Sequence, residues 1–406
     1  MKKIKLLFVQ ESLTLAGGEK SLIALLSNLN PDKYEIDLQL FKFGGALDEF
    51  IPDYVNLLPA LAYTQYAGKP WKCNFMSLLK FENISFFRSK ISYSIGIRKR
   101  KFNHPEKAQI YWECVGNSIQ INPKEYDVAI AYAQGVPTFY VIDKVMSKKK
   151  IAWVNVKLNF PKKNKIFQEK YYKTFDHIIT VSDITFGQFN LLYPHLKDRV
   201  STIYDIIDYK SMLKMSKLYK APFDKNIFNI LTVARLNRNQ KGYDITLEAC
   251  KTLKEKGISF HWYALGAGPY KEEMEVYIEE NNLQNHFSFL GTTVNPYPYF
   301  KAADLYVQTS RHEGYGISIA EARLLNIPVV TTRYDSVEVQ MIHEKNGLIT
   351  DLNPESVAEG IIRIMNDKEL YHSIKEYLKS EQKENTETVT KFDEMIEELL
   401  LGNEEC

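Results

Sequence analysis

Hydrophobic and polar residues follow two recurring patterns along the chain. Short apolar runs, typical of buried strands, are separated by segments in which apolar residues recur every three or four positions, as in helices. In the first half, the patterns predict strands over 4–10, 34–41, 126–133, 149–156 and 176–182, and a helix over 18–29. Because strands and helices alternate, we expect a parallel sheet covered by helices on both faces.

The same rhythm restarts after residue 220. Here the patterns predict strands over 228–236, 259–266, 287–291, 304–310 and 328–332, and helices over 242–257, 269–283 and 317–326. Residues 203–224 lack the alternation and are interpreted as a linker, whereas 368–401 is charged and helical in character. The fold class is therefore α/β, with two doubly wound, Rossmann-like domains and a cleft at the carboxyl ends of their sheets.

Length and composition agree with two soluble domains. A chain of 406 residues exceeds one ordinary core, and 45% hydrophobic with 25% charged residues is typical of a globular protein. We predict domains over 1–205 and 206–385, and a helix within 386–406 that packs back on the first domain. The apolar run 6–9 is too short for a signal peptide, so we interpret it as part of the first strand.

Charge and cysteine content narrow the function classes. Residues 1–200 carry a net charge of +11 and residues 201–406 a net charge of −9. This difference indicates two domains with different functions. No apolar run approaches the roughly 18 residues that span a bilayer. The four cysteines, Cys73, Cys114, Cys250 and Cys406, lack metal-binding spacing, so we expect a reducing compartment and no structural zinc.

Two glutamates bracket a glycine turn in "SRHEGYGISIAEA". The predicted helix begins near Gly316–Ile317, and its free N–H groups and dipole favour an anion. Glycines at 314 and 316 allow close approach to the backbone. Glu313 is then expected at the sugar end of a ligand and Glu321 at the hydroxyls of a ribose. The plainer alternative is a strand–turn–helix junction with two solvated acids, which a lone G-x-G pattern favours.

Further candidates follow other predicted strands. Arg235 and Lys241 come after the first strand of the second half, where two cations suit a diphosphate, although such residues alone are more often surface charges. Glycine loops occur in "LAGGEKS" (15–21) and "GAGP" (266–269), for which a plain tight turn is the alternative. Three such loops on one rim indicate a phosphate-binding site.

These motifs together resemble those of the family 4 glycosyltransferases. The resemblance rests on "AGGEKS", "ARLNRNQKGYD", "LGAGP", "FLGTTVNPYPYFKAADLYVQTSRHEGYGISIAEA" and "PVVTT…NGLI", and extends over nearly the whole chain. It implies the GT-B fold, with an N-terminal acceptor domain and a C-terminal nucleotide-sugar donor domain. It also implies that a sugar is transferred from a nucleoside diphosphate with retention at the anomeric carbon. We expect the nucleoside to be uridine.

The resemblance assigns roles by position. The implied catalytic residues are Glu313, Arg235 and Lys241. The implied donor-binding residues are Gly17, Gly18, Gly266, Gly268, Gly314, Tyr315, Gly316, Ile317, Glu321, Asn295 and Tyr297, and the acceptor-side residues are Asn155 and Gly135. Loop packing is an equal interpretation for the segment around Asn295 and Tyr297.

The sequence also departs from the family pattern. Asn155 stands where many relatives carry histidine, and Asp205 where asparagine is usual. The spacing from Arg235 to Lys241 is one residue longer than is common, and Val339 replaces an acid unless Glu338 serves instead. No Asp-x-Asp pair occurs, so we predict a metal-independent enzyme without a cofactor.

Residues 69–101 carry nine basic residues and one acid among several aromatic residues. This mixture suits an anionic membrane surface, while a solvated insertion is equally compatible and no nucleic-acid motif accompanies it. We therefore expect a cytoplasmic enzyme, peripheral on the inner membrane face, that acts on a glycan or lipid-linked glycan in capsule or cell-wall synthesis.

Two other functions stay open at this stage. The departures at Asn155 and Asp205 are compatible with a non-catalytic sugar-nucleotide-binding subunit, for which a partner protein is a further candidate. A nucleotide-sugar epimerase of the same fold is the third possibility.

Overall fold

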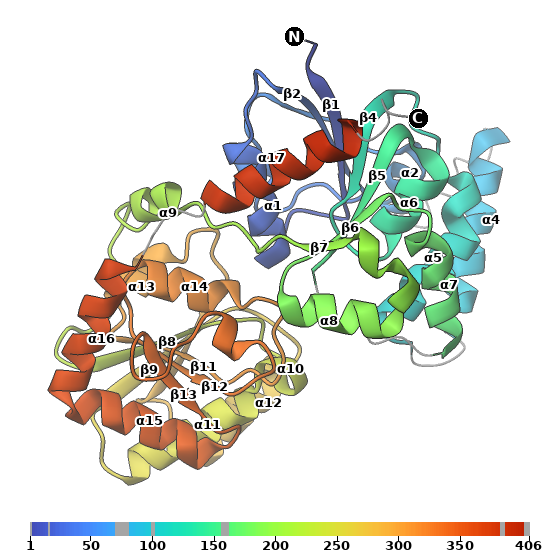
Figure 1. Ribbon diagram of the computed structural model, residues 1–406. Coiled ribbons are helices and arrows are strands. Elements are labelled where there is room, and N and C mark those ends of the chain that lie inside the picture. Colours follow the sequence, from blue (N-terminus) through green and yellow to red (C-terminus); the bar gives the residue numbers. More distant parts are fainter. Residues whose placement is uncertain are drawn as a thin grey trace. The chain divides into compact units, whose positions relative to one another are not determined.

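The computed structural model describes residues 2–14, 17–69, 81–98, 102–155, 162–381 and 386–401. The chain divides into two compact units (Figure 1). The first, the N-terminal unit, comprises Met1–Ile206 and Thr386–Cys406, and the second, the C-terminal unit, comprises Ile207–Asn385. Each unit is an α/β sandwich around one parallel sheet, as the alternating pattern predicted.

The N-terminal unit contains a seven-stranded sheet in the order β3-β2-β1-β4-β5-β6-β7, with all pairs parallel. Its strands are β1 Ile4–Gln10, β2 Tyr34–Leu40, β3 Val55–Leu57, β4 Glu125–Ala131, β5 Met146–Val154, β6 His177–Thr180 and β7 Val200–Thr202. Its helices are α1 Gly17–Asn28, α2 Ala62–Ala67, α4 Phe81–Gly96, α5 His104–Val115, α6 Val136–Lys144, α7 Lys162–Tyr172, α8 Asp183–Leu192 and α17 Thr386–Leu401. Short 3₁₀ turns cover Asp48–Phe50, Gly116–Ser118 and Pro194–Arg199.

The C-terminal unit contains a six-stranded parallel sheet in the order β10-β9-β8-β11-β12-β13. Its strands are β8 Phe228–Val233, β9 Phe260–Leu265, β10 Phe287–Gly291, β11 Leu305–Gln308, β12 Val329–Thr332 and β13 Gly347–Thr350. Its helices are α9 Tyr209–Met215, α10 Arg238–Lys241, α11 Tyr243–Glu255, α12 Lys271–Glu280, α13 Tyr297–Ala302, α14 Ile317–Leu324, α15 Pro354–Asn366 and α16 Lys368–Ser380, with a 3₁₀ turn at Val337–Val339.

Each sheet reverses its strand order at one point. In the N-terminal unit, β1 pairs with both β2 and β4. In the C-terminal unit, β8 pairs with both β9 and β11. At such a point the loops leaving the two neighbouring strands pass to opposite faces of the sheet, so a crevice opens at their carboxyl ends. The switch points therefore predict where each unit binds ligands.

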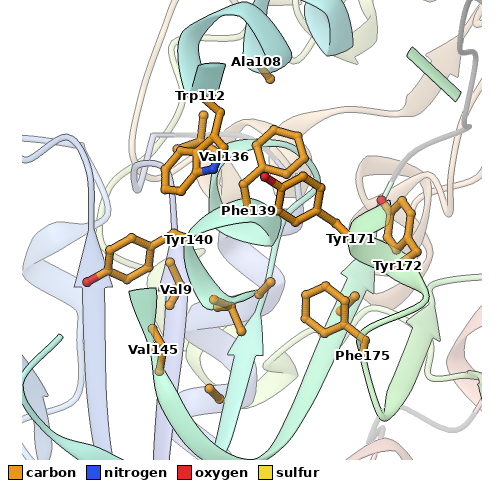
Figure 2. Close-up of a cluster of buried hydrophobic side chains, with 14 of the residues drawn as sticks. Val9, Ala108, Trp112, Val136, Phe139, Tyr140, Val145, Tyr171, Tyr172 and Phe175 are labelled. Atoms are coloured by element: carbon orange, nitrogen blue, oxygen red, sulfur yellow. The ribbon is translucent and has the colours of Figure 1, made fainter. Parts of the chain in front are cut away.

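An aromatic core holds the helices of the N-terminal unit to its sheet (Figure 2). The rings of Phe139 on α6 and Tyr171 on α7 lie 4.6 Å apart, and Trp112 on α5 packs against Phe139. Trp112 Nε1 and Tyr171 Oη both donate to Asp143 Oδ2, at 2.7 and 3.0 Å. One carboxylate thus pairs two of the polar atoms that these large rings carry into the core.

The predicted C-terminal helical segment is divided into α16 and α17, which belong to different units. Helix α17 packs on the N-terminal sheet through Phe392, whose buried ring stacks on Phe8 of β1 at 6.2 Å. Tyr34 Oη donates to Asp393 Oδ1 at 2.6 Å, and Lys33 Nζ lies 2.7 Å from Glu397 Oε1. The predicted linker 203–224 contains the short helix α9 and no strand.

Candidate functional site

The switch point of the C-terminal unit brings together most of the predicted site residues. Strand β8 leads through Arg235 into the short helix α10, which ends at Lys241, and the neighbouring strand β11 leads into the loop that carries Glu313. Because β8 and β11 are parallel neighbours, their carboxyl ends meet at one edge of the sheet.

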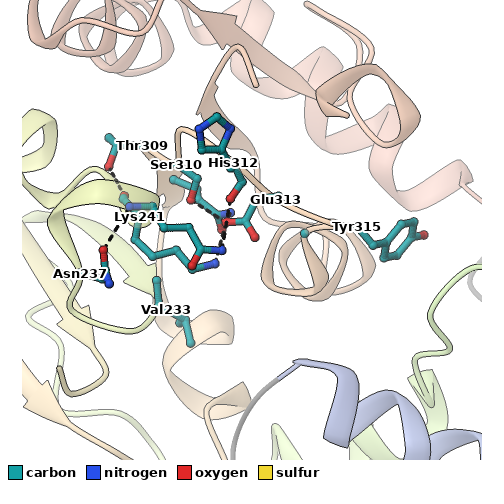
Figure 3. A network of polar contacts seen from close by, with 12 residues as sticks. Val233, Asn237, Lys241, Thr309, Ser310, His312, Glu313 and Tyr315 are labelled. Atoms are coloured by element: carbon teal, nitrogen blue, oxygen red, sulfur yellow. Dashed lines mark hydrogen bonds and ion pairs between the residues drawn. The ribbon is translucent and has the colours of Figure 1, made fainter. Parts of the chain in front are cut away.

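Glu313 is the centre of this network (Figure 3). Its Oε1 accepts hydrogen bonds from Lys241 Nζ at 2.6 Å, Gln308 Nε2 at 2.7 Å and Ser310 Oγ at 2.6 Å. The side chains of Lys241 and Glu313 are only 18% and 8% exposed, so they form a largely buried ion pair. No described residue hydrogen-bonds Oε2 of Glu313, which leaves that oxygen available to a ligand.

Backbone contacts hold the two loops against each other. Gly242 has φ +64°, and a Cβ built on it would lie 2.0 Å from the carbonyl oxygen of Thr309. The Thr309 hydroxyl lies 2.9 Å from the carbonyl oxygen of Gly242. Only glycine combines this conformation with so close an approach, so Gly242 is what allows Lys241 to reach Glu313.

A second ion pair fastens the same two loops. Arg311 forms a bidentate pair with Asp244, with hydrogen bonds of 2.9 and 2.8 Å. Although burial opposes it, the Arg311 guanidinium holds the pKa of Asp244 below its usual value. Arg235, in contrast, is exposed and forms no ion pair with any described residue. Of the two predicted phosphate-binding cations, one is thus paired with Glu313 and the other is available.

The predicted helix start is confirmed. Gly316, with φ +85°, is the N-cap of α14, and no side chain caps this helix. Ser336 Oγ donates to the carbonyl of Glu313 at 3.1 Å, and Gln340 Nε2 donates to the carbonyls of Tyr315 and Gly316. These bonds occupy the carbonyls of the turn, while the first N–H groups of a helix have no intrahelical partner. The Tyr315 side chain points away from the Glu313 network (Figure 3).

Glu321 and Tyr297, both predicted donor-binding residues, are in contact. Tyr297 Oη donates to Glu321 Oε1 at 3.0 Å, and Glu321 is buried. Burial and the neighbouring carboxylate raise the pKa of Tyr297 far above its usual value, so the tyrosine stays a donor. The side chain of Asn295 is held by a hydrogen bond from its Nδ2 to the Met215 carbonyl, at 2.9 Å.

Gly266 and Gly268 have a structural reason to be glycine. A Cβ on Gly266 would lie 2.0 Å from the carbonyl oxygen of Ala234, and one on Gly268 would lie 2.1 Å from that of Leu236. Both glycines therefore pack directly against the backbone of the loop that carries Arg235. Their predicted donor contact stays a prediction.

The residues predicted on the N-terminal unit follow three neighbouring strands of its sheet, and two of these residues are in contact. Asn155 follows β5, and its Nδ2 donates to the Tyr132 carbonyl at 2.7 Å. A Cβ on Gly18, in the first turn of α1, would lie 3.3 Å from the same Nδ2, and Gly17 begins that helix. Gly135 has φ +92° and is the N-cap of α6. Gly18 and Asn155 are thus neighbours.

Asp205, at the end of the N-terminal unit, is buried beside α1. The Ser21 hydroxyl hydrogen-bonds to it, yet burial raises the pKa of Asp205 to about 6. Ser21 Oγ also accepts from the backbone N–H of Ile206 at 3.0 Å and lies 3.2 Å from Tyr132 Oη. This cluster fixes the chain next to the boundary between the units.

The sequence analysis missed three residues of the Glu313 network. Gln308 and Ser310 donate to Glu313, and Tyr306 Oη donates to Gln308 Oε1 at 2.6 Å. A signal was present, because Gln308 is a polar residue at the end of an otherwise apolar strand and is only 2% exposed. A buried amide in such a strand needs polar partners.

Two further findings concern metals and membranes. Among the described residues no group of three or more His, Cys, Asp or Glu side chains is arranged to hold a metal ion. None of the helices in the described ranges has both the length and the apolar character required to span a bilayer. Of the predicted membrane-binding segment 69–101, residues 70–80 and 99–101 lie outside the described residues.

Solved structures share this architecture. A structure of Anabaena HepE with UDP and glucose is 17% identical, covers 97% of this chain and 99% of that one, and has a TM-score of 0.69. A Staphylococcus aureus TarM structure containing fondaparinux, α-GlcNAc-glycerol and UDP is 16% identical, covers 99% of both chains and has a TM-score of 0.64. The two Rossmann-like sheets are thus those of the GT-B glycosyltransferase fold, as predicted.

The sequence comparison finds a family match within the C-terminal unit. Residues 217–381 match the family described as glycosyl transferases group 1. The putative colanic acid biosynthesis glycosyltransferase WcaL of Escherichia coli K12 is 31% identical over 134 residues, which are 30% of this chain and 32% of the relative. A Staphylococcus aureus poly(ribitol-phosphate) α-N-acetylglucosaminyltransferase is 28% identical over 170 residues, 40% of this chain and 34% of the relative.

The matches therefore span about a third of the length of these curated relatives. They confirm the predicted resemblance to polysaccharide glycosyltransferases at the level of fold and family. The retaining mechanism and the roles of individual residues stay predictions.

Proposed function

We propose that the protein is a glycosyltransferase that moves a sugar from a nucleoside diphosphate to a glycan or lipid-linked glycan. The observation that carries this proposal is the environment of Glu313. One carboxylate oxygen is saturated by three donors and the other is open. The N-terminus of α14 follows on the same loop, and the exposed Arg235 follows the neighbouring strand β8. An acceptor for sugar hydroxyls thus lies next to positive groups that suit a diphosphate.

The same groups support a chemical role. When the bond between sugar and diphosphate breaks, negative charge develops on the leaving phosphate. Arg235, Lys241 and the α14 N-terminus supply positive charge without a metal ion, which together with the absence of an Asp-x-Asp pair favours a metal-independent reaction. We expect retention, with a phosphate oxygen of the leaving group accepting the proton of the acceptor hydroxyl.

The relatives support the substrate class. Anabaena HepE was solved with UDP-glucose and the Staphylococcus aureus enzyme with UDP, so uridine is our choice of base for this chain. Relatives named for colanic acid and amylovoran biosynthesis, and one named for poly(ribitol-phosphate), favour a surface polysaccharide as acceptor. We place the enzyme in the cytoplasm, where segment 69–101 meets the inner membrane face.

The decisive experiment measures sugar transfer from UDP-sugars to a membrane fraction containing lipid-linked glycans. We expect Glu313→Gln to lower kcat at least about 100-fold, because the open carboxylate oxygen is lost, while UDP affinity changes less than about threefold. Wild-type transfer should persist in EDTA. The matched control is Glu376→Gln on α16, whose exposed carboxylate pairs with Lys379, and it should retain full activity.

Three outcomes would contradict the proposal. Equal activity of wild type and Glu313→Gln would remove Glu313 from the reaction. Binding of UDP-sugars with no transfer to any acceptor would favour the binding-subunit alternative. Conversion of the donor sugar without an acceptor would identify an epimerase.

A further inference from the structure

Glu313 is held by a chain of buried groups that begins inside the sheet. Tyr306 and Gln308 are both on β11, two positions apart, so their side chains leave the same face of the strand. Tyr306 is fully buried and Gln308 is 2% exposed. Tyr306 Oη donates to Gln308 Oε1 at 2.6 Å, and Gln308 Nε2 donates to Glu313 Oε1 at 2.7 Å.

The orientation of the Gln308 amide is fixed by its two neighbours. A carboxamide can present either its oxygen or its nitrogen to a neighbour. The Glu313 carboxylate can only accept, which selects the nitrogen, and the Tyr306 hydroxyl donates to the oxygen. Burial raises the pKa of Tyr306 far above its usual value, so the phenol keeps its proton and remains a donor.

The chain also determines which carboxylate oxygen is open. Gln308, Ser310 and Lys241 all donate to Oε1, and no described residue donates to Oε2. Rotation of the carboxylate would break three hydrogen bonds at once. Two of the donors, Gln308 and Ser310, are neutral, so they hold the carboxylate even when Lys241 turns to a phosphate.

We propose that Gln308 is a positioning residue that, oriented by Tyr306, presents Oε2 of Glu313 to the sugar of the bound nucleotide sugar. Gln308 thereby governs recognition of the sugar and leaves recognition of the diphosphate to Arg235, Lys241 and the α14 N-terminus. This inference rests on the proposed function. It means that Gln308 helps to determine which sugar is bound without contacting the ligand itself.

The test compares two ligands that differ only in the sugar. Dissociation constants for UDP, UDP-glucose and UDP-N-acetylglucosamine are measured by calorimetry on the full chain, and the sugar nucleotide that wild type binds most tightly is used thereafter. Gln308→Met keeps the length of the side chain but removes the amide. We expect it to weaken binding of the UDP-sugar about tenfold and to leave binding of UDP within about twofold.

Two further variants separate positioning from folding. Tyr306→Phe leaves the amide in place without its orienting hydroxyl, so we expect a loss of sugar affinity smaller than that of Gln308→Met and again no loss for UDP. The matched control is Gln39→Met on β2, because Gln39 is also 2% exposed and its Nε2 donates to the Leu40 carbonyl at 2.9 Å. This control should leave both affinities unchanged.

Each other result has a definite meaning. If Gln308→Met weakens UDP and UDP-sugar equally, or leaves both unchanged, Gln308 is not a positioning residue for sugar recognition. The inference is equally overturned if wild type binds UDP as tightly as every UDP-sugar. If wild type binds none of the three ligands, the proposed function itself fails. If wild type binds a UDP-sugar more tightly than UDP and Gln308→Met does not, the result supports both the proposed function and the role of Gln308.

Discussion

Each unit buries a carboxylate near its switch point, and the two units treat it in opposite ways. Glu313 of the C-terminal unit receives three hydrogen bonds on one oxygen, one of them from the Lys241 ammonium. Asp205 of the N-terminal unit is buried as deeply, but burial dominates its environment and raises its pKa to about 6. The comparison shows that the groups around a buried acid, not its depth, decide what it does.

The two environments suit different tasks. A carboxylate whose charge is matched by a cation and two neutral donors remains a firm acceptor for a ligand. A carboxyl whose environment is dominated by burial is more stable when it is protonated. On this comparison we expect Glu313 to serve the site, and we expect Asp205, whose pKa burial raises to about 6, to serve the fold.

The largest expected effect comes from removing the cation beside Glu313. Lys241→Met leaves a largely buried carboxylate without its countercharge, and we expect the free energy of unfolding to fall by about 3 kcal/mol. Urea unfolding followed by circular dichroism measures it. The control is Lys42→Met, which breaks an ion pair with Glu11 whose side chains are 71% and 34% exposed; its loss should stay below about 1 kcal/mol. Equal losses in the two variants would contradict the comparison.

The next largest expected effect is a gain of stability at pH 7.5 when Asp205 is replaced by asparagine. The pKa of Asp205 in the folded protein, about 6, is higher than the value of 3.8 expected without the fold. The folded protein therefore holds this proton more tightly than the unfolded chain, and stability present below pH 4 is lost as the pH rises to about 6. Asp205→Asn does not titrate, so at pH 7.5 it should be more stable than wild type by about 2 kcal/mol.

A matched substitution tests the sign of this effect. Asp37 on β2 is also buried, but although burial opposes it, hydrogen bonds from Lys124, Tyr126 and Asn56 hold its pKa below the usual value. Asp37→Asn should therefore be less stable than wild type at pH 7.5. Unfolding experiments at pH 4 and pH 7.5 measure both variants. Destabilisation of Asp205→Asn at pH 7.5 would show that Asp205 is held as a carboxylate.

The smallest effect concerns a single hydroxyl. The Ser21 hydrogen bond lowers the pKa of Asp205 against the effect of burial. Ser21→Ala should raise that pKa further, and the pH at which stability is lost should move up by about half a unit. The pH dependence of the melting temperature measures the shift, with Ser310→Ala as the corresponding loss of one donor from Glu313. A downward shift for Ser21→Ala would contradict the assigned hydrogen bond.

Much of the fold could be predicted from the sequence. Strand 287–291 has the predicted limits, and the predicted strands 4–10 and 328–332 agree with β1 and β12 to within one residue. These segments are apolar runs bounded by polar residues or a proline, and their pattern alone is sufficient. The turn before α14 was predictable as well, because Gly316 must adopt a positive φ.

The contacts inside the site were not predictable in the same way. Lys241 and Glu313 are separated by 72 residues and meet only because β8 pairs with β11. The choice of Gln308 as a donor depends on the hydroxyl of Tyr306, which lies within the same strand and looks like an ordinary core aromatic. The close packing of Gly266 against the carbonyl of Ala234 was likewise not visible in the sequence. Local sequence specifies elements, but pairing between distant segments specifies their contacts.

The position of α17 has a consequence for how the protein is made. Phe8 and Trp153 are translated early. In the folded protein the centres of their rings lie 6.2 and 6.3 Å from the centre of the Phe392 ring on α17. Until residues 386–401 leave the ribosome, Phe8 and Trp153 lack the ring of Phe392 that packs against them, although the whole C-terminal unit has already been translated. Nascent chains of this protein should therefore attract chaperones that recognise exposed aromatic side chains, and should release them only when α17 docks.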